Sequence, residues 1–401
     1  MNSSTDVVVI GGGYAGVMAA NRLTLRGDVK VTLVNPRPTF VHRIRLHQLV
    51  GGTDTAVVAY EGLLAERVRL VVDTVTRIDA DDRGLVLAGG GTLTYDYLIH
   101  AVGSGSADPT VPGAAEFAHP LATFEEAAGL RQVLAATPAA TAVTVVGAGP
   151  SGIETAAELA EEGRAVTLVC GGVVGPYLHA RGRRSVARRL SKLGVSVLDG
   201  PGTRVTAVTR TAVTLADGRE VPSGLTVWTA GFAVPDLAVR SGLSTDPEGR
   251  LLTDETLISV DDGRIVAAGD SAAPSGLPVR MSCQAALPMG ARAADTVLSL
   301  IGGETPAVLN QPFGAQCISL GRGAGVLQFA DRFDTAVRLK VGGRLGAKLK
   351  EVICAGVVKQ LAAEAGEPGG YKLHRLERGG TRQRLVRADG DRARADLPSP
   401  A

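Results

Sequence analysis

The sequence has few cysteines and aromatic residues, almost no net charge and no long apolar run. Its four cysteines lie far apart among 401 residues, so there is no C-x-x-C dithiol and no Cys/His spacing typical of a metal site. A formal net charge of +2 argues against general nucleic-acid binding. No apolar run reaches the roughly 18 residues of a membrane span, and the first residues do not form a secretion leader. We therefore expect a soluble, cytoplasmic protein without a metal.

The sequence is rich in glycine, and the glycines form the same turn twice. In "VVVIGGGYAGVMAA", which begins at Val7, an apolar run leads into a G-x-G-x-x-G turn and then into helical apolar spacing. "VTVVGAGPSGIETAAELA", which begins at Val143, repeats this order. A strand, turn and helix of this form bring backbone N–H groups against a pyrophosphate. The turn glycines are Gly11, Gly13 and Gly16 in the first copy, and Gly147, Gly149 and Gly152 in the second.

The repeat extends beyond the glycine turns. The strand-like "LTYDYLIHAVGS" ends near Gly103, and "LTVWTAGF" has Gly231 in the corresponding place. Short alternating runs that predict a β-hairpin precede each of them. A duplication kept only for stability would not need both phosphate turns intact. We therefore predict that the protein binds two dinucleotides.

The two glycine turns, "YDYLIHAVGS", "VWTAGF" and "IVAAGDSA", in this order, resemble the FAD-dependent pyridine-nucleotide oxidoreductases. The missing dithiol and "QCISLGRGAGVLQFADRF" resemble the branch of type II NADH:quinone dehydrogenases and apoptosis-inducing-factor-like quinone reductases. The resemblance implies an α/β fold with two nested Rossmann-like dinucleotide-binding domains and a small C-terminal α+β region. The expected domains are 1–110 with 240–305 for FAD, 111–239 for NAD(P)H, and 306–365 at the C-terminal end.

The resemblance implies that the first glycine turn holds the FAD pyrophosphate. Asn35 ends the second strand, where the family usually has an acid, and its amide oxygen can still accept from a ribose hydroxyl. Val75 and Gly103 would touch the adenine side through their backbone. Gly269 and Asp270 match the family's Gly-Asp pair, whose acid binds the ribityl or phosphate region of FAD.

The same resemblance places NAD(P)H on the second glycine turn, with Gly231 beside it. Glu154 matches the acid of the family's G-x-E step, near the nicotinamide and the flavin; a role in the helix dipole is the alternative. Cys170 stands where an acid usually binds the NADH 2′-hydroxyl, so this position permits NADPH. The arginines of residues 181–184 either reach a 2′-phosphate or form a solvated helix face.

The acceptor side is expected near "VRMSCQAALPMGARAA", where a helix N-terminus faces the flavin in this family. Gln284 matches the first glutamine of the type II quinone signature, and Pro288 replaces the second. His42, Arg43 and His47 are further candidates for the acceptor site, with a structural role as the alternative. The resemblance makes Glu154 and Gln284 the catalytic candidates.

The structure of the last part of the chain is predicted from its charges and from the spacing of its apolar residues. Residues 338–361 combine helical apolar spacing with six basic residues and one acid. This pattern predicts a basic amphipathic helix, which either contacts an anionic membrane surface or packs its apolar face on the protein. Residues 366–401 are rich in glycine, arginine and aspartate and are expected to be disordered.

We predict an FAD-dependent NAD(P)H oxidoreductase that passes electrons to a quinone, in the cytoplasm or at the inner face of the membrane. The missing dithiol and the basic helix favour this reading. Two alternatives remain open: a soluble flavoenzyme with a protein or other small-molecule acceptor, favoured by Pro288, and a slow redox-sensing flavoprotein. The sequence also leaves open a homodimer and the choice between NADH and NADPH.

Overall fold

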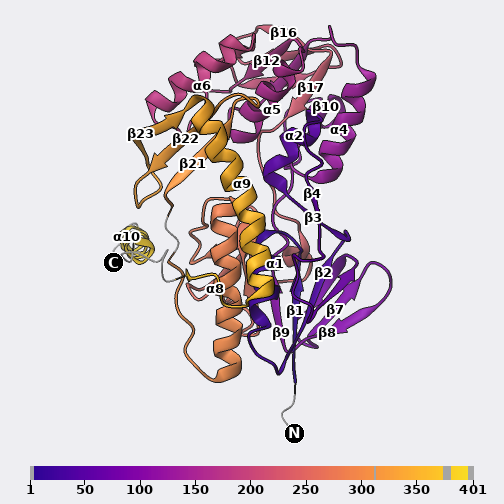
Figure 1. The fold of residues 1–401 in the computed structure, drawn as a ribbon, viewed down its shortest axis with the longest axis vertical. Coiled ribbons are helices and arrows are strands. Elements are labelled where there is room, and N and C mark those ends of the chain that lie inside the picture. The colour runs from indigo at the N-terminus through magenta and orange to yellow at the C-terminus, as the bar shows by residue number, and fades with distance from the viewer. Residues whose placement is uncertain (1–3, 311–312, 374–380, 396–401) are drawn as a thin grey trace, which may run out of the picture.

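A computed structural model describes residues 4–310, 313–373 and 381–395 of the chain. Its first unit is built on a five-stranded parallel sheet of order β19-β9-β1-β2-β5 (Figure 1). The strands are nearly continuous apolar runs because helices cover the sheet, as is usual in parallel sheets. The strands are β1 (Thr5–Ile10), β2 (Val29–Asn35), β5 (Val68–Val72), β9 (Tyr97–His100) and β19 (Ile265–Ala267).

The second unit repeats this plan around the second glycine turn. Its sheet has the order β10-β17-β11-β12-β13, and every pairing in it is parallel. The strands are β10 (Ala118–Pro120), β11 (Val143–Val146), β12 (Val166–Val169), β13 (Ser196–Leu198) and β17 (Leu225–Trp228). The helices of this unit are α3 (Ala114–Phe117), α4 (Phe124–Ala136), α5 (Pro150–Glu161) and α6 (Ala180–Lys192).

Each unit also carries a three-stranded antiparallel sheet at the corresponding place in the chain. These strands are β6 (Val75–Asp79), β7 (Gly84–Leu87) and β8 (Thr92–Thr94), and then β14 (Val205–Val208), β15 (Ala212–Leu215) and β16 (Glu220–Pro222). The chain leaves the first sheet after β9 and returns to it with β19, so the second unit is inserted into the first. The predicted α/β fold with two nested Rossmann-like units is confirmed.

Shorter elements connect the two units and complete the first. Helix α2 packs against α4 and α5 of the second unit, although it follows β3 of the first in the chain. These elements are β3 (Thr39–Val41), η1 (Arg43–Arg45), α2 (Leu46–Val50), β4 (Val57–Ala59), α7 (Leu237–Arg240), β18 (Leu251–Thr253), η2 (Gly269–Ser271) and β20 (Ala272–Pro274).

Two long helices cover the first sheet beside α1 (Tyr14–Leu23). Helix α8 (Cys283–Gly302) crosses α1 so closely that a Cβ on Gly290 would lie 2.2 Å from the Ala15 carbonyl oxygen. Helix α9 (Gly343–Gly366) runs from the C-terminal sheet down past α1 (Figure 1). Among the described residues, none of the helices combines the length and apolarity that crossing a bilayer requires.

The prediction of one helix over residues 338–361 is partly wrong, because the first residues of this range form the last strand of a C-terminal sheet. Strands β21 (Ala315–Ser319), β22 (Gly325–Ala330) and β23 (Ala336–Gly342) pair antiparallel, and α9 begins only after β23. The reason is local: Gly343 has φ +66°, which turns the chain at the Gly342-Gly343 pair. Arg338 and Lys340 therefore lie on a strand, and the helix extends to Gly366 instead of Leu361.

The expected disorder over 366–401 is also partly wrong. Helix α10 (Thr381–Ala395) follows, and Arg382 anchors it. The Arg382 guanidinium donates to both carboxylate oxygens of Glu255, each at 2.9 Å, and to the carbonyls of Pro274 and Leu277. The composition of this segment could not predict the contact, because it depends on the Arg382 side chain reaching Glu255, 127 residues away in the sequence. Residues 374–380 and 396–401 lie outside the described residues.

Candidate functional site

A cavity of about 1790 Å³ joins the two units and the C-terminal helix. It is lined by Gly11 and Gly13 of the first glycine turn, by Asp270 of η2 and by Glu154 of α5. Single-ligand pockets usually measure about 300–1,000 Å³. The cavity therefore has room for a dinucleotide together with a second ligand.

The first glycine turn is shaped by close backbone contacts. Gly11 has φ +101°, and a Cβ on it would lie 2.3 Å from the Ala101 carbonyl oxygen. A Cβ on Gly16 would lie 1.8 Å from the Gly11 carbonyl oxygen. Gly13 has no atom within 4 Å of its Cβ position, and it lines the cavity as the uncapped N-terminal residue of α1. The free N–H groups of that helix end are the donors that a pyrophosphate needs.

The second glycine turn has the same geometry. Gly147 has φ +124°, and a Cβ on Gly152 would lie 1.9 Å from the Gly147 carbonyl oxygen. Gly149 again faces open space and caps α5 without a side-chain hydrogen bond. The cavity wall at this end includes Pro150 and Ser151, which lie between Gly149 and Gly152.

Asn35 supports the first glycine turn from β2. Its Oδ1 accepts from the Gly12 N–H at 2.9 Å, and its Nδ2 donates to the Arg37 carbonyl at 2.8 Å. The side chain lines the cavity, but these bonds tie it to the turn. Val75 and Gly103 also line the cavity.

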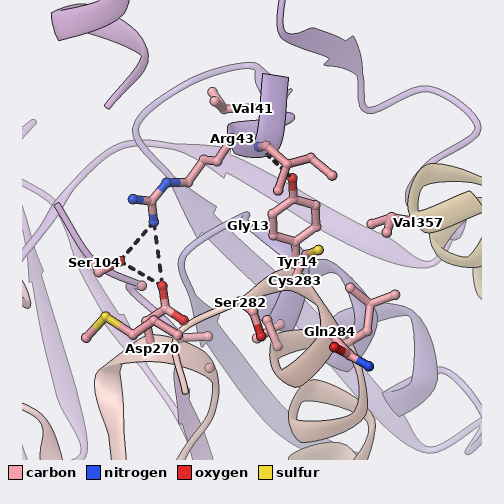
Figure 2. Close-up of a pocket in the computed structure, with 18 of the residues that line it drawn as sticks. Gly13, Tyr14, Val41, Arg43, Ser104, Asp270, Ser282, Cys283, Gln284 and Val357 are labelled. Atoms are coloured by element: carbon pink, nitrogen blue, oxygen red, sulfur yellow. Dashed lines mark hydrogen bonds and ion pairs between the residues drawn. The ribbon is translucent and has the colours of Figure 1, made fainter. Parts of the chain in front are cut away.

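Asp270 forms a polar cluster with two residues from other elements. Its Oδ2 accepts from the Ser104 hydroxyl at 2.7 Å and lies 3.8 Å from Nη1 of Arg43. Arg43 also donates to Ser104 at 3.1 Å, and Figure 2 shows the three side chains turned toward one another. Gly269 precedes Asp270 with φ +74° in the wall of the cavity. The sequence identified Asp270 and Arg43 separately, without their contact.

Glu154 is the centre of a buried charge network formed by three elements. Its Oε1 accepts from Nζ of Lys350, on α9, at 2.8 Å and from the Ser319 N–H at 2.8 Å. Nδ1 of His47, on α2, lies 3.4 Å from its Oε2. Glu154, Lys350 and His47 are each at most 6% exposed, and all three line the cavity. Lys350 was missed as a site residue because its sequence context indicated a solvated basic face.

The network fixes the charge of each member. Burial raises the pKa of Glu154, but Lys350, His47 and the Ser319 N–H outweigh it and lower that pKa. Burial opposes the charge of Lys350, yet Glu154 raises the Lys350 pKa well above its ordinary value. Burial and the charges of Lys350, Arg322 and Arg45 hold the pKa of His47 at about 4, despite Glu154. At neutral pH the network is therefore a carboxylate, an ammonium group and a neutral imidazole.

Helix α8 begins at the cavity, beside Tyr14. The Ser282 hydroxyl caps it by accepting from the Ala285 N–H at 3.2 Å, and Cys283 and Gln284 line the cavity. Figure 2 shows Cys283 against the Tyr14 ring, with Gln284 on the next part of the helix. The Tyr14 hydroxyl accepts from the Ile44 N–H at 3.3 Å. The structure therefore brings Gln284 and Glu154, the two catalytic candidates, to the wall of one cavity.

Three other predicted residues have different surroundings. Cys170 lies at the end of β12, outside the cavity wall. Gly231, with φ +85°, lines a small separate pocket beside Thr229. His42 is buried but does not line the cavity, in contrast to His47. The four cysteines are free thiols, and no cluster of metal ligands occurs among the described residues.

The geometry fits the two cofactors expected from the sequence. Two uncapped helix N-termini with open glycines at Gly13 and Gly149 can each take a pyrophosphate. Arg43 supplies a positive charge to the first part of the cavity, and the cavity volume accommodates an extended ligand. FAD would be held by the first turn and by the Asp270 cluster, and NAD(P)H by the second turn.

Comparisons with known proteins agree with this geometry. The sequence profile of the family described as pyridine nucleotide-disulphide oxidoreductase matches residues 5–290. An NADH dehydrogenase-like protein of Mycobacterium tuberculosis is 33% identical over 353 residues, which cover 80% of this chain and 87% of that protein. A type II NADH:quinone oxidoreductase of the same organism is 30% identical over 374 residues, with coverages of 81% and 78%.

A solved structure gives the same fold at lower identity. The sulfide:quinone oxidoreductase of Aquifex aeolicus superposes with a TM-score of 0.75 and 21% identity, over 90% of this chain and 92% of that one. The family match covers most of the chain, and the fold, the duplicated turns and the sequence relatives agree. The chain therefore belongs to the pyridine nucleotide-disulphide oxidoreductase family, and it is an oxidoreductase whose cofactors are FAD and NAD(P)H.

Proposed function

We propose that the protein transfers electrons from NAD(P)H, through FAD, to a lipid quinone. The observation that carries the proposal is the single cavity: it connects the first glycine turn to Glu154 and opens along α9. In this proposal residues 1–110 and 240–305 bind FAD, and residues 111–239 bind NAD(P)H. The sequence relative named as a type II NADH:quinone oxidoreductase supports the same acceptor class.

The proposed FAD contacts follow from the polar groups of the first unit. The N–H groups after Gly13 face the pyrophosphate, and Arg43 balances its charge. Asp270, held by Ser104, accepts hydrogen bonds from hydroxyl groups of the ribityl chain. Val75 and Gly103 offer backbone groups at the adenine side. Asn35 acts indirectly, because its amide holds the Gly12 N–H in the turn.

The proposed chemistry separates electrons from protons. The first glycine turn and the Asp270 cluster would hold FAD, which would supply the two-electron chemistry: it would take a hydride from NAD(P)H and give two electrons and one proton to the acceptor. A quinone needs one further proton to become a quinol, and Lys350 Nζ holds a proton at the cavity wall, 2.8 Å from Glu154. We therefore propose Glu154 and Lys350 as the proton-holding pair, with Gln284 as a hydrogen-bonding group on the acceptor side.

The mouth of the cavity supports a lipid quinone rather than a small polar acceptor. Val352, Ile353 and Val357 of α9 line it, and Val352 is 67% exposed. Leu345 lies two turns before Val352 on α9 and is 58% exposed, and Leu339 of β23 is 62% exposed. Four basic residues lie on the same two elements, namely Arg338 and Lys340 of β23 and Arg344 and Lys348 of α9. Exposed apolar side chains and cations on the same elements are suited to an anionic membrane.

The proposal is tested with vesicles of phosphatidylcholine and phosphatidylglycerol that contain a long-chain quinone. We expect the double variant Leu339→Glu/Leu345→Glu to reduce this quinone at least about five-fold more slowly, because two charges oppose insertion of the surface. Its rate with a short-chain, water-soluble quinone is expected to stay unchanged. Val239→Glu, at a 52% exposed valine of α7, is the matched control. Equal rates for the double variant and the control would count against the membrane route.

A soluble flavoenzyme with another acceptor is the second candidate. Pro288 within α8 favours it, since it stands where the type II quinone signature has a glutamine. In that case wild-type protein would be reoxidised quickly by a soluble electron acceptor and slowly by every quinone. A redox sensor would be reoxidised slowly by both.

A further inference from the structure

Helix α5 carries a second buried acid, Glu158, one turn after Glu154. Glu158 is 2% exposed and lies outside the cavity wall. Residues four apart on a helix lie on the same face, with their Cβ atoms about 5–6 Å apart. The Ser319 N–H, at the end of β21, donates to Glu154 Oε1 at 2.8 Å. Arg322, in the turn after β21, donates to the Ser319 hydroxyl at 3.1 Å, and its Nε lies 3.3 Å from Glu158 Oε1. Polar contacts therefore join the two acids.

Helix α2 and the residues after it also pack along both acids. His47 lies beside Glu154, with its Nδ1 3.4 Å from Oε2 of that acid. One turn later on α2, a Cβ on Gly51 would lie 2.3 Å from Cγ of Glu158. The Thr53 hydroxyl donates to Glu158 Oε1, and Thr53 is exposed to solvent. Glu158 therefore connects an exposed residue with the part of α5 that carries Glu154.

Two buried polar atoms beside these acids have no hydrogen-bond partner within the described part of the chain. They are Oε2 of Glu158 and Nε2 of His47, whose side chain is 4% exposed. A buried carboxylate oxygen without a donor is costly, whereas a protonated carboxyl can itself donate from that oxygen. A neutral imidazole that donates from Nδ1 to Glu154 is an acceptor at Nε2. The two atoms therefore have the properties of a proton donor and a proton acceptor.

The surroundings of Glu158 favour its protonated form. Burial raises the pKa of Glu158, and the charges of the two acids at residues 161–162 add to this effect. The hydrogen bond from Thr53 and the charge of Arg322 oppose the shift without cancelling it. The pKa of Glu154, in contrast, is lowered. Of the two acids, Glu158 is therefore the one that takes up a proton more readily.

We propose that Glu158 is the relay residue that carries protons from the solvent to the buried pair of Glu154 and Lys350. The inference rests on the proposed function, in which Lys350 gives one proton to a quinone oxygen. Lys350 then regains a proton through Glu154. Glu154 receives that proton from Nδ1 of His47 while Nε2 takes the proton of Glu158, and water beside Thr53 reprotonates Glu158. One proton enters and one leaves in each turnover, and no electron moves in the relay.

The test separates a single reoxidation from repeated turnover in the FAD-loaded protein. For the first measurement, protein reduced by NADH is mixed anaerobically with menadione; for the second, steady-state turnover is followed with both in excess. We expect Glu158→Gln to leave the single reoxidation unchanged, because Lys350 already holds its proton. Steady-state turnover of this variant should fall about ten-fold, because the proton is replaced slowly. The glutamine oxygen can still accept from Thr53 and Arg322, so the contacts between α2, α5 and the turn after β21 are kept.

Two further measurements separate proton transfer from a structural role. The solvent deuterium isotope effect on steady-state turnover should be larger in Glu158→Gln than in wild-type protein, and Glu158→Asp, which keeps a carboxyl group, should recover turnover. Glu162→Gln is the matched control, because Glu162 lies on the same helix but is exposed and pairs with Arg131 at 3.1 Å. We expect it to leave both rates unchanged.

The outcomes distinguish the relay from the proposed function on which it rests. Equal losses of Glu158→Gln in the two measurements, or an unchanged steady-state turnover, would overturn the relay. Wild-type protein that is reduced quickly by NADH but reoxidised slowly by menadione would instead count against the quinone as acceptor.

Discussion

The buried pair of Glu154 and Lys350 predicts a large coupling energy between α5 and α9. Lys350→Met removes the cation but keeps an unbranched side chain, and it leaves the carboxylate with the Ser319 N–H and His47. Removing one partner of a buried ion pair costs about 3–5 kcal/mol. Because the charge-assisted bond from Ser319 remains, we expect a loss of about 3 kcal/mol, at the low end of that range.

A double-mutant cycle separates the pair from its surroundings. Glu154→Gln leaves Lys350 buried without an anion and is expected to cost about as much as Lys350→Met. The double variant buries neither charge, so its loss should be smaller than the sum by about 2–3 kcal/mol. Additive losses would refute the reasoning. As a control, Arg240→Met breaks the exposed pair with Asp236 and should change stability little.

Unfolding in guanidinium can be followed by the fluorescence of Trp228. It is the only tryptophan of the chain, and it lies in β17 of the second sheet, as part of the same unit as Glu154. The pair also connects that unit to α9. Loss of the pair should therefore shift the midpoint of the tryptophan transition in the FAD-loaded protein.

The contribution of Glu154 to stability is expected to depend on pH in opposite ways in wild-type protein and in Lys350→Met. In wild-type protein the pKa of Glu154 lies below its unfolded value, so its stabilisation is present above about pH 4.3 and is lost as the pH falls through the folded pKa. In Lys350→Met burial dominates and raises the pKa of Glu154 above that value. The deficit of the variant should then be largest at neutral pH and shrink toward pH 4. A deficit independent of pH would contradict a charged Glu154.

Further predictions concern packing, titration and the C-terminal helix. Gly16→Ala should cost more than about 3 kcal/mol or prevent FAD binding, because its Cβ would lie 1.8 Å from a carbonyl oxygen. Gly129→Ala, in open space on α4, should instead stabilise by about 0.5–1 kcal/mol in thermal unfolding. His47→Asn should lessen the loss of stability between about pH 6.5 and 4 by about 3 kcal/mol, since burial holds the pKa of His47 at about 4. Arg382→Ala should speed proteolysis at α10; an unchanged rate would argue against its anchoring role.

The sequence predicted the parts of the fold that depend on local geometry. A glycine at the positions of Gly16 and Gly152 is required within a single turn, because both approach a carbonyl five residues earlier in the chain. The strand and helix patterns around these turns are local as well. For that reason the two nested units, and the paired positions of Gly103 and Gly231, could be recognised from the repeat alone.

The features that the sequence did not predict, or predicted wrongly, depend on contacts between residues far apart in the chain. Lys350 lies 196 residues from Glu154, and the sequence before it contains the exposed cations Arg344 and Lys348, so no local signal distinguishes it. The helix expected to begin at Arg338 failed because strand β23 gains its partner from β22. The order of α10 depends on Arg382 meeting Glu255, 127 residues away. Such pairings require the tertiary fold.

The most direct test of the central claim is anaerobic stopped-flow spectroscopy on the FAD-loaded protein. NADH should bleach the flavin absorption, and a water-soluble quinone should then restore it at a rate that supports turnover. Lys350→Met and Glu154→Gln should slow the second step more than the first, because the proposed proton-holding pair serves the acceptor. Fast reduction by NADH followed by slow reoxidation by every quinone would contradict the account.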